Sequence, residues 1–181
     1  KVTAGLQITA QKEKVFERFP KLDAVIAGES ELALAELAGV LLQKEKWGQV
    51  KGLIYRQNGK IIVNPRQEIL SSLDLIPKYD YSIFDSQVFW RPYNGQVVKA
   101  VDYEMSRGCI FTCSYCVETV LQSYYDVTER SPNSGALMQP KKYLRSKSAA
   151  RIYEELEELN KKFGVTLVRC QDTNFLTNEE I

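Results

Sequence analysis

Three of the four cysteines lie close together, and their spacing is the strongest chemical signal in the chain. Cys109, Cys113 and Cys116 follow the pattern C-x3-C-x2-C, so a loop of eight residues presents three thiolates. Thiolates are soft ligands that suit iron–sulfur clusters. An electron-transfer cluster normally takes four thiolates, so three leave one iron of a [4Fe-4S] cluster open to another ligand. The spacing therefore predicts a cluster that does chemistry at its open iron.

Few other residues of the chain could act as soft metal ligands. The sequence has no histidine, which excludes imidazole as a metal ligand, a general base or the partner of a nucleophile. The fourth cysteine, Cys170, stands alone in an apolar stretch, where we expect a buried free thiol. The alternative is a structural zinc site that Cys170 completes with a fourth thiolate. Such sites usually combine two C-x2-C pairs, so the isolated Cys170 favours the cluster.

The elements on either side of the cysteines predict a strand, a loop and a helix. Residues 100–105 alternate as a strand does, Gly108 permits a sharp turn, and a short helix is expected over about 116–123. Ligand sites of parallel sheets and barrels gather in the loops that follow strands. The position of the cysteines thus agrees with their spacing.

The last part of the chain predicts a second strand beside the first. Ser148 can cap a helix that ends at Gly164, and residues 165–168 form an apolar strand. The helix carries an apolar face made of Ile152, Leu156, Leu159 and Phe163. A strand, a helix and a strand in this order are the unit of a parallel sheet.

The first part of the chain also alternates between helices and strands. The expected elements are a helix over 9–19 capped by Thr9, a strand over 22–27, a turn at Gly28 and a helix over 31–46 capped by Ser30. Two apolar runs then flank Asn58-Gly59, which predicts a β-hairpin with a type I′ turn.

Composition bounds the environment and the partners. The 181 residues are 44% hydrophobic and 26% charged, and no apolar run has the roughly 18 residues that span a bilayer. The 24 basic and 23 acidic residues nearly cancel, so we expect no nucleic-acid or membrane partner. We also expect a cytoplasmic protein. The chain begins with Lys1 and has no secretory signal, so we expect it to be cut from a longer protein.

The cysteine segment resembles the signature of radical S-adenosylmethionine enzymes, including the aromatic Tyr115 before the last cysteine. The resemblance implies that the amino and carboxylate groups of S-adenosylmethionine bind the open iron and that Tyr115 lies near the adenine. It also implies that an electron from the cluster cleaves S-adenosylmethionine to methionine and a 5′-deoxyadenosyl radical, which takes a hydrogen from the substrate.

Two downstream segments are similar to segments of the cobalamin-binding branch of that family, namely Tyr143-Leu-Arg-Ser146 and Asp172-Thr-Asn-Phe175. The resemblance implies that Asp172 and Asn174, at the carboxyl end of a strand, face the S-adenosylmethionine pocket. The alternative is that both residues only form the turn.

Upstream, residues 23–31 read Asp-Ala-Val-Ile-Ala-Gly-Glu-Ser-Glu and resemble a segment of the cobalamin domain of the same branch. The resemblance implies that Gly28 and Glu29 lie beside the corrin. The alternative is a strand-to-helix turn with a capping serine. Residues 73–77 and 79–81 are similar to the junction between the cobalamin domain and the barrel.

The order of these segments predicts an α/β fold in three parts. Residues 1–63 are expected to form the C-terminal part of a Rossmann-like cobalamin-binding domain, 64–98 a connector, and 99–181 the N-terminal part of a TIM-type radical barrel. Compared with the family the chain looks like a fragment, so the catalytic residues that position the substrate are expected beyond Ile181 and are unknown.

The resemblance implies a radical enzyme that acts on a small-molecule substrate and takes its electron from a reductant such as flavodoxin or ferredoxin. We expect it to depend on cobalamin and to transfer a methyl group. Two alternatives stay open. One is a radical enzyme without cobalamin, similar to methylthiotransferases, and the other is a zinc-stabilised binding module without catalysis.

Overall fold

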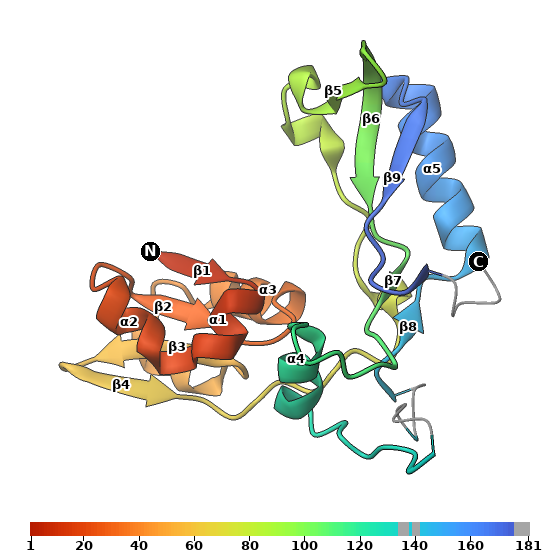
Figure 1. Cartoon of the computed structure of the whole chain (residues 1–181). Helices are drawn as coiled ribbons and strands as arrows, with labels where there is room; N and C mark the ends of the chain where they lie inside the picture. The colour runs from red at the N-terminus through yellow and green to blue at the C-terminus, as the bar shows by residue number, and fades with distance from the viewer. Residues whose placement is uncertain (134–137, 139–141, 176–181) are drawn as a thin grey trace. The chain divides into compact units, whose positions relative to one another are not determined.

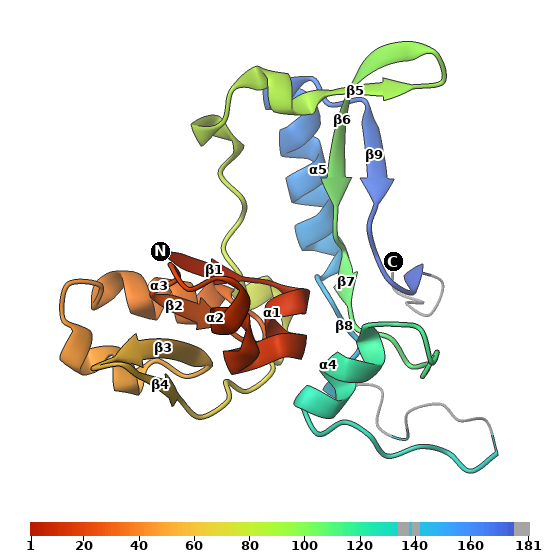
Figure 2. The ribbon, with the colours of Figure 1, turned by 60° about the vertical axis from the view of Figure 1, so that its left-hand side comes forward.

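The computed structural model describes residues 1–133, 138 and 142–175, and the chain divides into two compact units (Figures 1 and 2). The first unit comprises residues 1–70 and 111–139, and the second comprises 71–110 and 140–181. The last residues of the expected barrel segment, 176–181, lie outside the described part. The change of unit after Ile110 falls inside the cysteine segment.

The first unit is built on a four-stranded mixed sheet. Its strands, in spatial and chain order, are β1 (Val2–Ala4), β2 (Ala24–Ile26), β3 (Leu53–Gln57) and β4 (Lys60–Val63). The pairing of β1 with β2 is parallel, and the other two pairings are antiparallel. At the β3–β4 turn Asn58 and Gly59 have φ values of 50° and 77°, and two positive values are what a type I′ turn requires. The predicted hairpin is confirmed.

Helical segments pack on both faces of this sheet. They are α1 (Leu6–Gln11), the 3₁₀ helix η1 (Lys12–Lys14), α2 (Val15–Arg18), α3 (Glu31–Gly39), the 3₁₀ helix η2 (Lys44–Gln49) and α4 (Glu118–Tyr124). Val25 of β2 packs with Val15 and Phe16 of α2, whereas its neighbour Ile26 packs with Leu37 of α3. Successive residues of a strand point to opposite faces, so the wholly apolar β2 supplies both cores.

The second unit holds a three-stranded sheet and a long helix. Its elements are the 3₁₀ helices η3 (Leu73–Leu75), η4 (Tyr81–Ile83) and η5 (Ser86–Phe89), the strands β5 (Trp90–Tyr93), β6 (Gln96–Tyr103), β7 (Ser106–Arg107), β8 (Arg145–Ser146) and β9 (Leu167–Cys170), and α5 (Ala149–Phe163). The order is β5-β6-β9, with β5 antiparallel and β9 parallel to β6. Figure 2 shows α5 running along this sheet.

Two local signals place α5 where the sequence predicts it. The Ser148 side chain accepts a hydrogen bond from the Arg151 amide at 3.2 Å, and Gly164 ends the helix in the left-handed conformation with φ 69°. One face of α5 packs against the sheet through Ile152 and Leu159. The predicted strand, helix and parallel strand are therefore confirmed in β6, α5 and β9.

Two expected helices differ from the structure. The first begins at Leu6 and breaks at Lys12, where φ is 51°, and Thr9 is a buried residue inside it. The Thr9 hydroxyl donates to the Gly5 carbonyl at 3.1 Å instead of capping the helix. The second ends at Gly39, and Ser30 stands at its N-cap without a side-chain bond, because its backbone is helical and not extended.

A second hairpin was not predicted, although its signal is of the same kind. Asn94 and Gly95 join β5 to β6 with φ values of 48° and 75°. The prolines and the mixed aromatic pattern around β5 favour an irregular connector, and the turn dipeptide outweighs them. None of the described helices is long and apolar enough to cross a lipid bilayer.

Candidate functional site

The cysteine segment begins with a turn that only glycine can make. Strand β7 pairs with β8, and the next residue, Gly108, has φ 97°. A Cβ atom at this position would lie 2.4 Å from the Tyr143 carbonyl oxygen and 2.9 Å from its ring. Both the backbone conformation and the close approach exclude larger residues. Cys109 follows this turn, is 8% exposed and belongs to the second unit.

Asp172 anchors the chain that leads to this turn. Its Oδ1 atom accepts hydrogen bonds from the Met105 amide at 3.1 Å and from the amide and hydroxyl of Ser106. Its Oδ2 atom accepts one from the Cys170 thiol. A single carboxylate thus holds the residues that follow β6 against those that follow β9. Its expected role at S-adenosylmethionine stays a prediction, and the observed role is to fix the backbone.

Asn174 lies against the first cysteine of the segment. Its Nδ2 atom is 3.8 Å from Cys109 Sγ, within hydrogen-bond range for sulfur. Hydrogen bonds to cysteine sulfurs are one of the means by which proteins set the potential of iron–sulfur clusters. Of the two polar residues expected after β9, Asn174 reaches a predicted cluster ligand, and Asp172 holds the backbone beside it.

Cys113 and Cys116 form a single turn that leads into α4 in the first unit. The Cys116 amide donates to the Cys113 carbonyl at 3.0 Å, and the Thr119 hydroxyl donates to the Cys116 carbonyl at 2.8 Å. Cys113 is exposed and Cys116 is half-buried. The C-x2-C spacing therefore places two thiols one turn apart at the start of a helix.

Tyr115 projects from this turn and is 89% exposed. A hydrogen bond with Cys113, together with the nearby thiols, raises the pKa of Tyr115 above its ordinary value. Its ring is open to a planar partner. That this partner is the adenine stays a prediction.

All four cysteines are free thiols, as a ligand set requires. Within residues 1–133, 138 and 142–175, no three or more Cys, Asp or Glu side chains are grouped so that they could hold a metal ion. The structure therefore brings Cys113 and Cys116 into one turn and Cys109 to Asn174. The joining of all three thiols on one cluster stays a prediction.

The expectation of a buried Cys170 is wrong. Cys170 is exposed at the end of β9, because β9 is an edge strand of the described sheet and its last two residues are exposed. Loss of solvent around the sulfur and its hydrogen bond to Asp172 raise the pKa of the Cys170 thiol.

The Gly28-Glu29 turn follows β2, as predicted, and the side chains of Tyr124 and Tyr125 lie against it. A Cβ atom on Gly28 would lie 2.7 Å from Tyr125 Oη and 3.0 Å from Tyr124 Cε1. The Glu29 amide donates to Tyr125 Oη at 2.7 Å, and its carboxylate accepts from the Leu70 amide at 3.2 Å. These contacts fill the space on the tyrosine side of Gly28. That Gly28 and Glu29 lie beside a corrin stays a prediction.

The two tyrosines are site residues that the sequence did not single out. Tyr125 and Glu29 are 96 positions apart, so no short-range pattern could have connected them. The available signal was the adjacent Tyr124-Tyr125 pair at the end of a short helix, and aromatic pairs of this kind are more often ordinary core residues.

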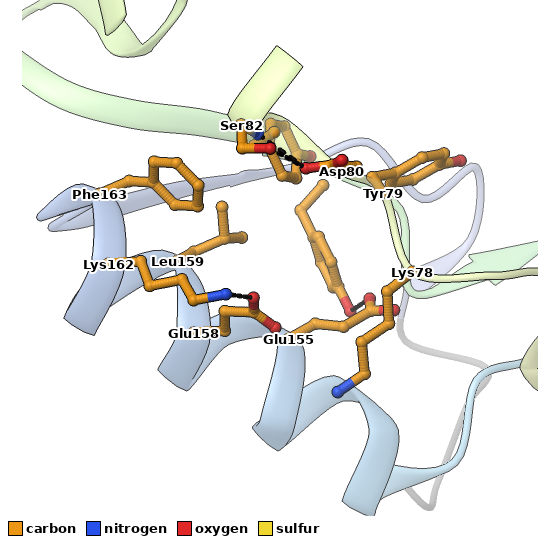
Figure 3. Close-up of a pocket in the computed structure, with 11 residues that line it drawn as sticks. Lys78, Tyr79, Asp80, Ser82, Glu155, Glu158, Leu159, Lys162 and Phe163 are labelled. Atoms are coloured by element: carbon orange, nitrogen blue, oxygen red, sulfur yellow. Dashed lines mark hydrogen bonds and ion pairs between the residues drawn. The ribbon is translucent and has the colours of Figure 1, made fainter. Parts of the chain in front are cut away.

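The second unit contains a cavity of about 450 Å³ between η4 and α5 (Figure 3). Its charged side chains are paired with one another or with neighbours. Lys162 pairs with Glu158 at 2.5 Å, Lys78 with Glu154 at 2.9 Å, and Asp80 accepts from the Ser82 amide at 2.9 Å. The cavity therefore has the character of a surface pocket lined by satisfied ion pairs.

No protein-family model matches the chain. The uncharacterized methyltransferase PH0819 of Pyrococcus horikoshii is 27% identical over 179 residues, which are 99% of this chain and 34% of that protein. The cobalamin-dependent radical SAM methyltransferase TokK of Streptomyces tokunonensis is 28% identical over 117 residues, 64% of this chain and 17% of TokK. Over 64% of its length the chain is therefore similar in sequence to a cobalamin-dependent radical S-adenosylmethionine enzyme.

The fold agrees with these radical enzymes. The cobalamin-dependent S-adenosylmethionine radical enzyme OxsB, solved with aqua-cobalamin and S-adenosylmethionine bound, matches 96% of this chain with a TM-score of 0.62 and 21% identity. The match covers 21% of the OxsB chain, so this chain spans about a third or less of the length of its relatives. The mixed α/β fold is shared with this group of enzymes.

Proposed function

We propose that this chain is the cluster-carrying part of a cobalamin-dependent radical S-adenosylmethionine enzyme that acts on a small molecule. One observation carries the proposal. The segment C-x3-C-x2-C stands between a strand and a helix in a chain that is similar in sequence to TokK over 64% of its length and shares the fold of OxsB over 96% of it. The names of PH0819 and TokK favour methyl transfer as the reaction.

Cys109, Cys113 and Cys116 would hold the cluster, and the chemistry of this donor set fits, since three free soft thiolates leave one iron for another ligand. A bound cluster would supply the electron that cleaves S-adenosylmethionine. The chain's own residues prepare the site. Asp172 fixes the backbone before the loop, Asn174 donates to the Cys109 sulfur, and the exposed Tyr115 ring offers a stacking surface for adenine.

The finer architecture is part of the same proposal. Residues 1–63 form the end of a Rossmann-like domain, 64–98 a connector, and 99–181 the start of a radical barrel. The parallel pairing of β6 with β9 across α5 supports the last assignment, because it is the repeating unit of such a barrel. We further propose a cytoplasmic location and a flavodoxin- or ferredoxin-like reductant.

Anaerobic reconstitution of the chain with iron and sulfide tests the cluster. We expect about four irons per chain and, after reduction, an electron paramagnetic resonance signal that changes when S-adenosylmethionine is added. Alanine at Cys109, Cys113 or Cys116 should abolish the signal. Cys170→Ala is the matched control, since it also removes a thiol of the chain and should retain the signal.

Three results would contradict the proposal. The first is loss of the cluster in the Cys170→Ala variant, because the fourth thiol would then be a ligand and no iron would be open. The second is preferential binding of one zinc ion by the four cysteines. The third is a reduced cluster whose spectrum does not respond to S-adenosylmethionine, which would indicate electron transfer only.

A further inference from the structure

Tyr124, the last residue of α4, and Tyr125, the residue after it, both contact the turn after β2 within the first unit. The rings of Tyr124 and Tyr125 pack edge to face, with centroids 5.0 Å apart and an interplanar angle of 83°. The Tyr124 hydroxyl donates to the Ala27 carbonyl at 3.1 Å, and the Tyr125 hydroxyl accepts from the Glu29 amide at 2.7 Å. Each tyrosine thus reaches the backbone on one side of Gly28.

The contact requires glycine at position 28. Its φ of 89° is a conformation that side chains disfavour, and its missing Cβ leaves the space that Tyr125 Oη occupies. The Gly28 amide donates to the Thr9 hydroxyl at 2.9 Å, and this hydroxyl is held by the Gly5 carbonyl at 3.1 Å. The turn is therefore fixed from one side by α1 and filled from the other by the tyrosines.

Two cations bind the Tyr124 end of the contact. Lys12 Nζ lies 5.4 Å from the centroid of the Tyr124 ring, and the Arg66 guanidinium lies 6.0 Å from it. Arg66 also donates to the Tyr124 carbonyl and pairs with Asp126 at 2.8 Å. Cations near the face of an aromatic ring are attracted by its quadrupole. Figures 1 and 2 both show α1 and α4 side by side.

We propose that Tyr124 and Tyr125 lock α4 onto the Ala27-Gly28-Glu29 turn and thereby position the Cys113–Cys116 turn. Helix α4 begins at Glu118, directly after that turn, and Thr119 holds the Cys116 carbonyl. A helix fixed at its C-terminal end cannot rotate about its axis, so the start of the helix and the two thiols before it are fixed as well.

The lock gives Gly28 and Glu29 a function other than the corrin contact that the resemblance implies. Glycine is required at position 28 because a Cβ atom would clash with Tyr125 Oη. The Glu29 amide finds its hydrogen-bond acceptor in the same hydroxyl. The existence of the lock is independent of the proposed function, whereas its positioning role rests on the three-cysteine cluster.

Tyr125→Phe in the metal-free, reduced chain tests the lock. The variant keeps the ring and removes the acceptor of the Glu29 amide. A hydrogen bond of ordinary strength then predicts about two- to tenfold faster hydrogen exchange at Glu29 and along α4. The control is Tyr153→Phe, which removes an exposed hydroxyl bonded to Glu157 in the second unit. Equal exchange at Glu29 in Tyr125→Phe and the control would overturn the lock.

Gly28→Ala provides a second and independent test. Its Cβ would meet Tyr125 Oη, so we expect faster exchange along α4 than in Tyr125→Phe. Tyr125→Phe added to Gly28→Ala removes the clashing atom and should restore part of the protection, so the two changes are not additive. Additive effects would show that Gly28 and Tyr125 do not touch.

The positioning role is read on the reconstituted chain. Tyr125→Phe should keep the iron content and broaden or shift the electron paramagnetic resonance signal, and Tyr153→Phe should leave it unchanged. An unchanged signal in Tyr125→Phe would overturn positioning. The exchange measurements need no metal, so failure of cluster assembly and failure of the lock give different results.

Discussion

A buried carboxylate in the second unit provides the sharpest test of how α5 is held to the sheet. Glu155 is 7% exposed and accepts hydrogen bonds from Lys147 Nζ at 2.7 Å, from Tyr103 Oη at 2.5 Å and from Arg151. Lys147 is itself 8% exposed, and its Nζ lies 4.2 Å from the Tyr103 ring centroid. One carboxylate therefore compensates two cations, of which Lys147 has almost no access to water.

Glu155→Gln should destabilise the second unit strongly. The amide keeps the shape of the side chain and removes its charge, so Lys147 is left as a buried cation without a counterion. Breaking a buried pair in this way costs about 3 to 5 kcal/mol. Adding Lys147→Met should recover much of that loss, because it replaces the stranded ammonium by an apolar group of similar length.

The same network sets a pH dependence. Burial acts to raise the pKa of Glu155, but hydrogen bonds from Lys147, Tyr103 and Arg151 outweigh it and hold the pKa below its ordinary value. Because its pKa is lower in the folded than in the unfolded state, Glu155 stabilises the fold fully above the unfolded-state pKa of about 4.3. This stabilisation is lost as the pH falls through the lower pKa of the folded state. Glu155→Gln should remove this part of the acid transition.

Native-state hydrogen exchange of β6 and α5 amides as a function of urea measures these changes in the second unit alone. Glu157→Gln is the control on the same helix. Its carboxylate pairs with Lys161 at the surface, and we expect no measurable change. Equal losses in the two variants, or a Glu155→Gln variant as stable as the parent chain, would refute the reasoning.

Three further changes follow from single contacts. Gly108→Ala should cost at least about 1 to 3 kcal/mol in the second unit from its positive φ alone, and more from the clash with the Tyr143 carbonyl, measured by urea unfolding. Asn64→Ala removes bonds of 2.7 and 2.8 Å to two buried carbonyls and should cost the first unit about 1 to 3 kcal/mol in the same assay. Asp172→Asn removes the carboxylate beside Cys170 and should lower the pKa of the Cys170 thiol. Alkylation of Cys170, measured by mass spectrometry, should then begin at a lower pH. An unchanged pH profile of alkylation would exclude the hydrogen bond.

The features that could be predicted from the sequence are those with a local cause. The Asn58-Gly59 turn, the Ser148 cap and the Gly164 stop each depend on one or two residues whose conformational preference is strong. They fix the β3–β4 hairpin and the bounds of α5. The mixed α/β fold follows from the alternation of such elements.

Features that depend on distant partners could not be predicted. Nothing near Thr9 in the sequence shows that its hydroxyl will accept the Gly28 amide, and the same side chain is an ordinary helix cap by its local pattern. The apolar strand over 165–168 that precedes Cys170 predicts a core position for its thiol. The pairing order of the strands, which the local pattern does not contain, puts β9 at an edge and exposes the thiol.

Asp172 shows why a correct position in the fold does not by itself give a role. Its place after a strand predicts a carboxylate at the end of the sheet, where ligands of parallel sheets bind. At the same edge, however, two backbone amides and a hydroxyl that follow β6 lack partners within the sheet, and the carboxylate satisfies them. Charge-assisted hydrogen bonds to amides are strong and leave few lone pairs for a further ligand. The neighbouring Asn174, whose amide reaches Cys109, is therefore the residue of this segment through which we expect a substitution to change the proposed cluster without unfolding the loop.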